Sequence, residues 1–136
     1  MVTQKLARIG LLLLSVLSLT GAIAPTAFAQ RIQLLGQARL SLRENDLDVL
    51  KLSRCQVPPV RDIKLRALRG TAEIQLLVVQ YGNNQLDRLP VRSRLRERSE
   101  TNWIPLRGTL RCIRGIAIVG SSVGSTNRAI IQFYAR

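Results

Sequence analysis

Five arginines stand close together between positions 88 and 98, and they are the residues of this sequence with the clearest potential for binding chemistry. Residues two apart along a β-strand share one face. A strand here would present a stripe of guanidinium groups from Arg92, Arg94, Arg96 and Arg98, with Arg88 just before it. Guanidinium groups make two-point contacts with sulfate, phosphate and carboxylate. The stripe therefore predicts an anion-binding strip.

The same stripe has a second interpretation that needs no ligand. Charged side chains protect an edge strand from pairing with another chain, and Pro90 indicates an edge because proline cannot donate to a ladder. Nucleic acid is not an expected partner, since single strands need aromatic residues between the basic ones and this stretch has none. Both interpretations stay open at this point.

Most catalytic chemistries lack their usual residues in this chain. There is no histidine, which removes the commonest general base and metal ligand, and no GxxxxGK or GxGxxG phosphate loop occurs. The chain does have 8 acidic residues, so a hydrolase that acts on glycans with two carboxylates stays as an alternative. The main prediction is a non-catalytic protein without a cofactor.

Three smaller features have a functional and an ordinary interpretation each. Glu44, Asp46 and Asp48 offer oxygen ligands for calcium, but they lack the spacing of a calcium loop, so we expect a solvated turn and no metal. Trp103 is a candidate platform for a sugar ring, yet its apolar neighbours favour the core or its edge. The small-residue run 120–127 is expected to be a loop.

Cys55 and Cys112 are the only two cysteines. In an oxidising compartment they can form one disulfide and no other. That bridge would close a long loop, which is worth roughly 4 kcal/mol in the chain-entropy model. Structural zinc needs four Cys or His ligands, so a structural disulfide is the expectation.

Residues 1–29 have the pattern of a cleavable secretory signal. Lys5 and Arg8 give the positive start, residues 9–19 are mostly apolar, and residues 27–29 read Ala-Phe-Ala. The apolar run is shorter than the roughly 20 residues of a membrane-spanning helix. We therefore expect cleavage after Ala29 and a periplasmic or secreted product, residues 30–136, without a transmembrane segment.

The chain is strongly basic, with 21 lysines and arginines against 8 acids and a net charge of +13. Loss of the signal would lower this charge by only two. Such a charge favours polyanionic partners, and an exported protein meets acidic glycans, lipopolysaccharide and anionic lipid headgroups first. Another envelope protein, bound through exposed strand edges, is an alternative partner, and a merely solubilising charge is the simplest interpretation.

Hydrophobic residues recur with a period of two along most of the chain, which indicates strands. Gly36 suggests a bulge, and residues 74–79, apolar at both alternating positions, indicate a central strand covered on both sides. The predicted strands are 33–42, 47–52, 63–69, 71–81, 89–95, 110–119 (carrying Cys112) and 128–136, with a short apolar segment at 103–106. This pattern predicts a single all-β domain, a two-sheet antiparallel sandwich of jelly-roll type; a small closed barrel is the alternative.

An ordered set of short motifs runs through most of this domain, between positions 34 and 134. They are Leu34-Leu35-Gly36, Asn45-Asp46-Leu47-Asp48 with Leu50, Leu52 and Cys55, Ile63-Lys64-Leu65, Leu89-Pro90-Val91-Arg92-Ser93, Thr101-Asn102-Trp103-Ile104 and Arg111-Cys112-Ile113. In this order they resemble the YaaI-like family of small exported bacterial proteins, a domain of unknown function. The resemblance implies export and a shared fold, and it supplies no activity and no catalytic residues.

Overall fold

The computed structural model describes residues 21–22, 31–43, 45–56, 58–108, 110–124 and 128–136, which form eight β-strands and no helix. Apart from residues 21–22, the predicted signal and its cleavage site fall outside these residues. The strands are β1 (Gln33–Arg39), β2 (Asp46–Lys51), β3 (Asp62–Arg69), β4 (Thr71–Tyr81), β5 (Leu86–Leu95), β6 (Ile104–Pro105), β7 (Ile113–Val123) and β8 (Ile130–Ala135). A helix of the length and apolar character of a membrane span is not found in the described ranges.

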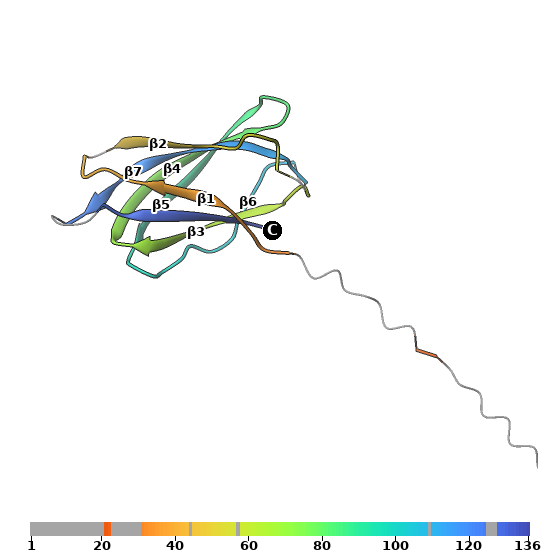
Figure 1. The fold of residues 1–136 in the computed structure, drawn as a ribbon, viewed down its shortest axis with the longest axis horizontal. Coiled ribbons are helices and arrows are strands. Elements are labelled where there is room, and N and C mark those ends of the chain that lie inside the picture. Colours follow the sequence, from red (N-terminus) through yellow and green to blue (C-terminus); the bar gives the residue numbers. More distant parts are fainter. Residues whose placement is uncertain (1–20, 23–30, 44, 57, 109, 125–127) are drawn as a thin grey trace, which may run out of the picture.

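The strands pair like one long hairpin that has been rolled up. β1 pairs with β8, β2 with β7, β3 with β6 and β4 with β5, all antiparallel. The result is two sheets, which we call sheet A (β1-β8-β3-β6) and sheet B (β2-β7-β4-β5). They form the two layers in Figure 1. This is the strand order of a jelly roll, so the predicted sandwich is confirmed and the closed barrel is wrong.

The core lies between the two sheets and follows the predicted alternation. In β3, Ile63 and Leu65 are fully buried while Lys64 points to the outer face. In β8, Ile131 and Phe133 are fully buried in the same way. Burying a side chain of this size contributes roughly 1.5–3 kcal/mol, so this period-two pattern fixes which face of each strand turns inward.

β4 is a central strand of sheet B, as predicted, but only one of its faces is covered by the other sheet. Leu77 and Val79 are fully buried against sheet A. Leu76 and Val78 lie on the outer face and are half-buried. The prediction of cover on both sides is therefore wrong for the described residues, and the outer face of sheet B keeps an apolar middle.

The small-residue run after β7 is the clearest departure from the predicted elements. Residues 120–123 continue β7 along β4 instead of forming a loop. Gly120 lies so close to β4 that a side chain there would collide with the carbonyl oxygen of Glu73. Ser122 is buried; its hydroxyl donates to the carbonyl of Leu40 at 2.8 Å and accepts from the amide of Ala129 at 2.7 Å. The small side chains of this run therefore allow the neighbouring strands to pack closely against it.

The disulfide between Cys55 and Cys112 is present, with the two Cα atoms 5.5 Å apart. Cys112 precedes β7, which begins at Ile113, so the predicted placement of this cysteine within the strand is wrong. The bridge joins the segment after β2 to the segment before β7. A disulfide is consistent with a location outside the reducing cytosol.

Candidate anion-binding face

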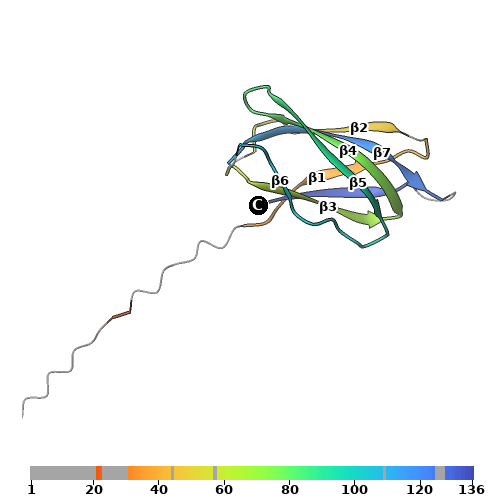
Figure 2. The same cartoon turned by 180° about the vertical axis from the view of Figure 1, so that it is seen from behind.

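β5 is an edge strand of sheet B, as Pro90 predicts, and its pairing with β4 contains a β-bulge. The register shifts so that Val91 and Arg92 both oppose Gln75. Arg92 adopts a φ of +44°, a left-handed conformation that costs a non-glycine residue roughly 1–2 kcal/mol. Bulges of this kind re-aim side chains and are common beside functional sites. The strand can be followed in Figure 2.

Three arginines of β5 gather on the outer face of sheet B. Arg88, Arg92 and Arg94 are exposed and line an open depression of about 760 Å³ across β4 and β5. Glu73 and the ring of Pro90 line it as well. We call Arg88, Arg92 and Arg94 the arginine face. Guanidinium groups thus stand at three outward positions of the edge strand, with Pro90 at the outward position between Arg88 and Arg92.

The other two arginines of the predicted stripe lie beyond the end of β5. Arg96 follows the strand directly and lines a neighbouring depression of about 460 Å³ together with Arg94, Thr71 and the acidic Glu97. Arg98 sits in a turn, with a φ of +65°, and its amide donates to the carbonyl of Ala67 in sheet A at 2.7 Å. Arg96 therefore extends the arginine face, whereas Arg98 belongs to the segment that connects β5 of sheet B to β6 of sheet A.

One carboxylate partly balances the arginine face. Arg94 Nη1 lies 3.8 Å from Glu73 Oε1, and both side chains are more than half exposed, so solvent screens this pair strongly. Arg88, Arg92 and Arg96 form no ion pair with any residue that the structure describes. A cluster of nearly uncompensated guanidinium groups in a depression is a favourable place for a multivalent anion.

Trp103 lies on the opposite side of the molecule, on the outer face of sheet A, and is half-buried outside the core. Lys64 Nζ is 4.6 Å and the Arg136 guanidinium 4.4 Å from the centroid of its ring. Lys64 is also paired with Glu100 at 3.1 Å and Arg136 with Asp62 at 3.0 Å. These two cations lie over the indole ring, so the ring is not a free platform for a sugar.

Of the three acids proposed as calcium ligands, Asp46 and Asp48 lie in β2 itself, where each has a partner in the chain. Asp48 accepts a 2.8 Å hydrogen bond from the amide of Arg39, which links the edges of the two sheets. The hydroxyl of Ser41 bonds to Asp46 and lowers the pKa of that carboxyl. Glu44 falls outside the described residues. Within those ranges, no three His, Cys, Asp or Glu side chains gather as metal ligands would.

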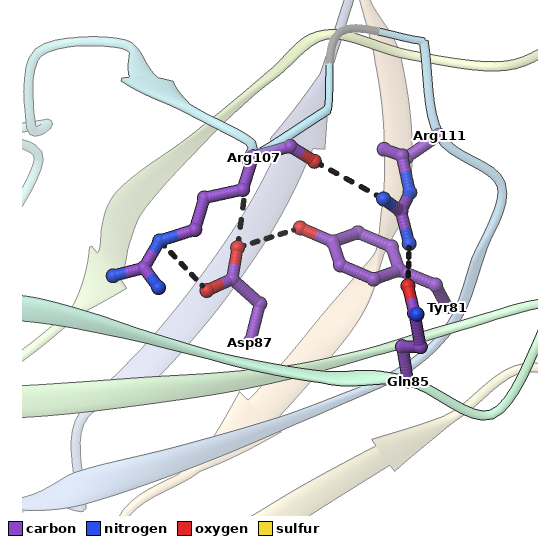
Figure 3. A network of polar contacts seen from close by, with 5 residues as sticks. All are labelled: Tyr81, Gln85, Asp87, Arg107 and Arg111. Carbon is purple, nitrogen blue, oxygen red and sulfur yellow. Dashed lines mark hydrogen bonds and ion pairs between the residues drawn. The ribbon is translucent and has the colours of Figure 1, made fainter.

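A polar network that sequence reasoning missed closes the disulfide end of the sandwich (Figure 3). Asp87 points inward from β5 and is 5% exposed; it accepts a 2.9 Å hydrogen bond from the hydroxyl of Tyr81. Arg107 Nε lies 3.3 Å from the other carboxylate oxygen, which accepts no hydrogen bond from a described residue. The guanidinium of Arg111 stacks 3.8 Å from the Tyr81 ring and donates to Gln85 at 3.0 Å.

This network stabilises a buried charge and has little reactivity of its own. Burial raises the pKa of Tyr81 to about 12, with a smaller contribution from the bond to Asp87, so the phenol stays protonated at neutral pH. The carboxylate of Asp87 is shielded beneath Arg107. The sequence does contain one signal for this site, which is an acidic residue at a position expected to face inward. Asp87 stands two residues before Leu89, so the two side chains share the inner face of the strand. A charge buried there requires partners.

The sequence matches a family model described as Domain of unknown function (DUF2541) over residues 10–135. That range includes all eight strands of both sheets. No curated protein and no solved structure matches the chain. The geometry of the molecule is therefore the basis for any functional conclusion.

Proposed function

Because the chain belongs to the DUF2541 family, which carries no assigned function, we propose from its geometry that it is a non-catalytic binding protein of the cell envelope. Its ligands are anionic groups, the phosphates or sulfates of glycans and lipid headgroups. The arginine face and Arg96 bind them. Export through the signal in residues 1–29, and membership of the YaaI-like group on the ordered motifs given above, are parts of the same proposal.

The observation that carries this proposal is the conformation of Arg92. The bulge holds an arginine where glycine or asparagine would be accommodated at lower cost, and the side chain there is exposed rather than packed. Strained backbone persists where the surrounding structure imposes it, and it clusters at functional sites. Anion binding gives a reason for a guanidinium at this position that folding alone does not give.

The distribution of carboxylates supports binding rather than two-carboxylate hydrolysis. Asp87 is buried under Arg107, while Asp62 and Glu100 are each ion-paired on the outer face of sheet A. Glu73 alone of the described acids lies in the depression of the arginine face. A glycosidase needs a second carboxyl group opposite the first, so the depression offers contacts for an anion and no catalytic pair.

The proposal is tested by comparing two triple variants in their affinity for a soluble sulfated glycan, heparin, and for lipopolysaccharide. Arg88→Ser, Arg92→Ser and Arg94→Ser together should weaken binding about tenfold or more, since each exposed ionic contact contributes roughly 0.2–1 kcal/mol. Arg39→Ser, Arg69→Ser and Arg128→Ser remove the same charge from exposed positions elsewhere. Equal losses in both variants would show that only net charge matters and would reject the site.

A further inference from the structure

The outer face of sheet B has an apolar band that the described chain leaves uncovered. Cross-strand registers place two rows side by side on this face: Leu47, Val119, Leu76 and Pro90 in one, and Val49, Ala117 and Val78 in the next. Leu47, Val49 and Leu86 are 59%, 45% and 67% exposed. Large side chains exposed together on one face mark an interaction surface rather than random exposure.

Basic residues border this band at both ends. The arginine face lies along β5 at one end. At the other end, Lys51 and Arg114 line a depression of about 300 Å³ whose floor includes Val49 and Leu86. Glu73 is the only described acid that lines this depression or that of the arginine face, whereas on sheet A the carboxylates of Asp62 and Glu100 neutralise neighbouring cations. The face is thus apolar in its middle and positive at its rims.

We infer that the outer face of sheet B docks flat onto a lipid bilayer that carries anionic headgroups. The inference rests on the proposed anion binding and adds the apolar band to it. Surfaces that combine exposed apolar side chains with basic ones bind at the boundary between headgroups and acyl chains, and each basic residue near an anionic leaflet adds to the attraction. A second copy of this chain would instead bring like charges together.

In this arrangement the two parts of the face have separate tasks. The guanidinium groups of Arg88, Arg92 and Arg94 contact lipid phosphates, while Leu47, Val49 and Leu86 enter the boundary region. Trp103 lies on the outer face of the other sheet and stays in water. The bound orientation therefore predicts that the native tryptophan is remote from the membrane.

The first test measures binding to vesicles of phosphatidylcholine with and without phosphatidylglycerol. The protein should bind the anionic vesicles, and Leu47→Ser, Val49→Ser and Leu86→Ser together should weaken that binding about tenfold, from the lost burial of three apolar side chains. The matched control, Leu34→Ser, Leu68→Ser and Leu110→Ser, changes leucines that are 55%, 42% and 52% exposed on other surfaces. It should bind as the parent does. Heparin affinity should be unchanged in both variants.

The outcomes separate this inference from the proposed function. Unchanged vesicle binding by the Leu47, Val49 and Leu86 variant, together with a loss in the arginine-face variant, would overturn bilayer docking and leave headgroup binding intact. Failure of the parent to bind anionic vesicles while it binds heparin would also overturn docking alone. Failure to bind either ligand would reject the proposed function and the docking with it.

A second measurement reports the orientation without removing any contact. Lipids brominated in their acyl chains quench tryptophans that enter the bilayer. The Leu86→Trp variant should be quenched on binding, whereas the parent, whose single tryptophan is Trp103, should not be quenched. Quenching of the parent to the same extent as the variant would place the wrong face on the membrane and overturn the inference.

Discussion

The hydroxyl of Tyr81 donates a 2.9 Å hydrogen bond to the buried carboxylate of Asp87, and this contact ties the end of β4 to the start of β5. The bond lies next to the disulfide, where Arg111 covers the phenol ring. A buried carboxylate is expensive unless it is paired and hydrogen-bonded. The Tyr81–Asp87 pair is therefore a stabilising element of this end of the sandwich.

Tyr81→Phe should lower the free energy of unfolding by about 1–3 kcal/mol. The carboxylate oxygen of Asp87 that accepts from Tyr81 would then keep only a long hydrogen bond from the Arg107 amide. Urea unfolding followed by circular dichroism measures the change. Tyr134→Phe is the control, since its hydroxyl bonds to Gln132 on the outer face of sheet A. Equal effects of the two substitutions would contradict a special role for the buried pair.

The raised pKa of Tyr81 predicts a loss of stability at alkaline pH. Burial favours the neutral phenol in the folded protein, so the pKa rises from 10.0 to about 12. The stabilisation is then complete below pH 10 and is lost as the pH rises through about 12, because the unfolded chain releases the proton more easily. The free energy of unfolding of the parent should fall faster over this range than that of Tyr81→Phe. If the free energies of unfolding of the two proteins fall in parallel as the pH rises, the pKa of Tyr81 is not raised.

The disulfide should contribute a large share of the stability. Its cysteines are 57 positions apart, and closing a loop of this size in the unfolded chain is worth roughly 4 kcal/mol. Cys55→Ala with Cys112→Ala, or reduction of the parent, should lower the urea midpoint by a corresponding amount. If the reduced and oxidised proteins unfold at the same urea concentration, the bridge does not constrain the chain as described.

The sequence predicted the sandwich because alternation and turn residues act locally. Ile63, Leu65 and Phe133 face inward simply because a strand has a period of two. The extension of β7 through Gly120 could not be predicted in this way. It depends on the close approach of β4, and a run of glycine and serine reads equally well as a loop.

The arginine stripe was predicted in part for the same reason. Arg92 and Arg94 share the outer face, as the period-two rule predicts, but the strand ends at Leu95, so Arg98 leaves the stripe. The bulge at Arg92 had no sequence signal, because neither glycine nor asparagine marks the left-handed position. Asp87 was missed because its ion-pair partner Arg107 approaches it from a distant segment.

Arg92→Gly separates stability from binding. Glycine adopts positive φ without the Cβ penalty, so the free energy of unfolding should stay within about 1 kcal/mol of the parent or rise. Affinity for heparin should fall. Arg69→Gly is a control at an exposed arginine without positive φ. Marked destabilisation by Arg92→Gly would mean that this arginine is kept for folding, and the argument from backbone strain would fail.

The most direct test of the anion-binding face is a nuclear magnetic resonance titration of the labelled protein with a short sulfated oligosaccharide. The account predicts that the largest shifts occur at the guanidinium Nε–H groups of Arg88, Arg92 and Arg94 and at the amides of residues 73–76 beside them. Shifts centred on Lys64, Trp103 and Arg136 of sheet A, with the arginine face unaffected, would contradict it.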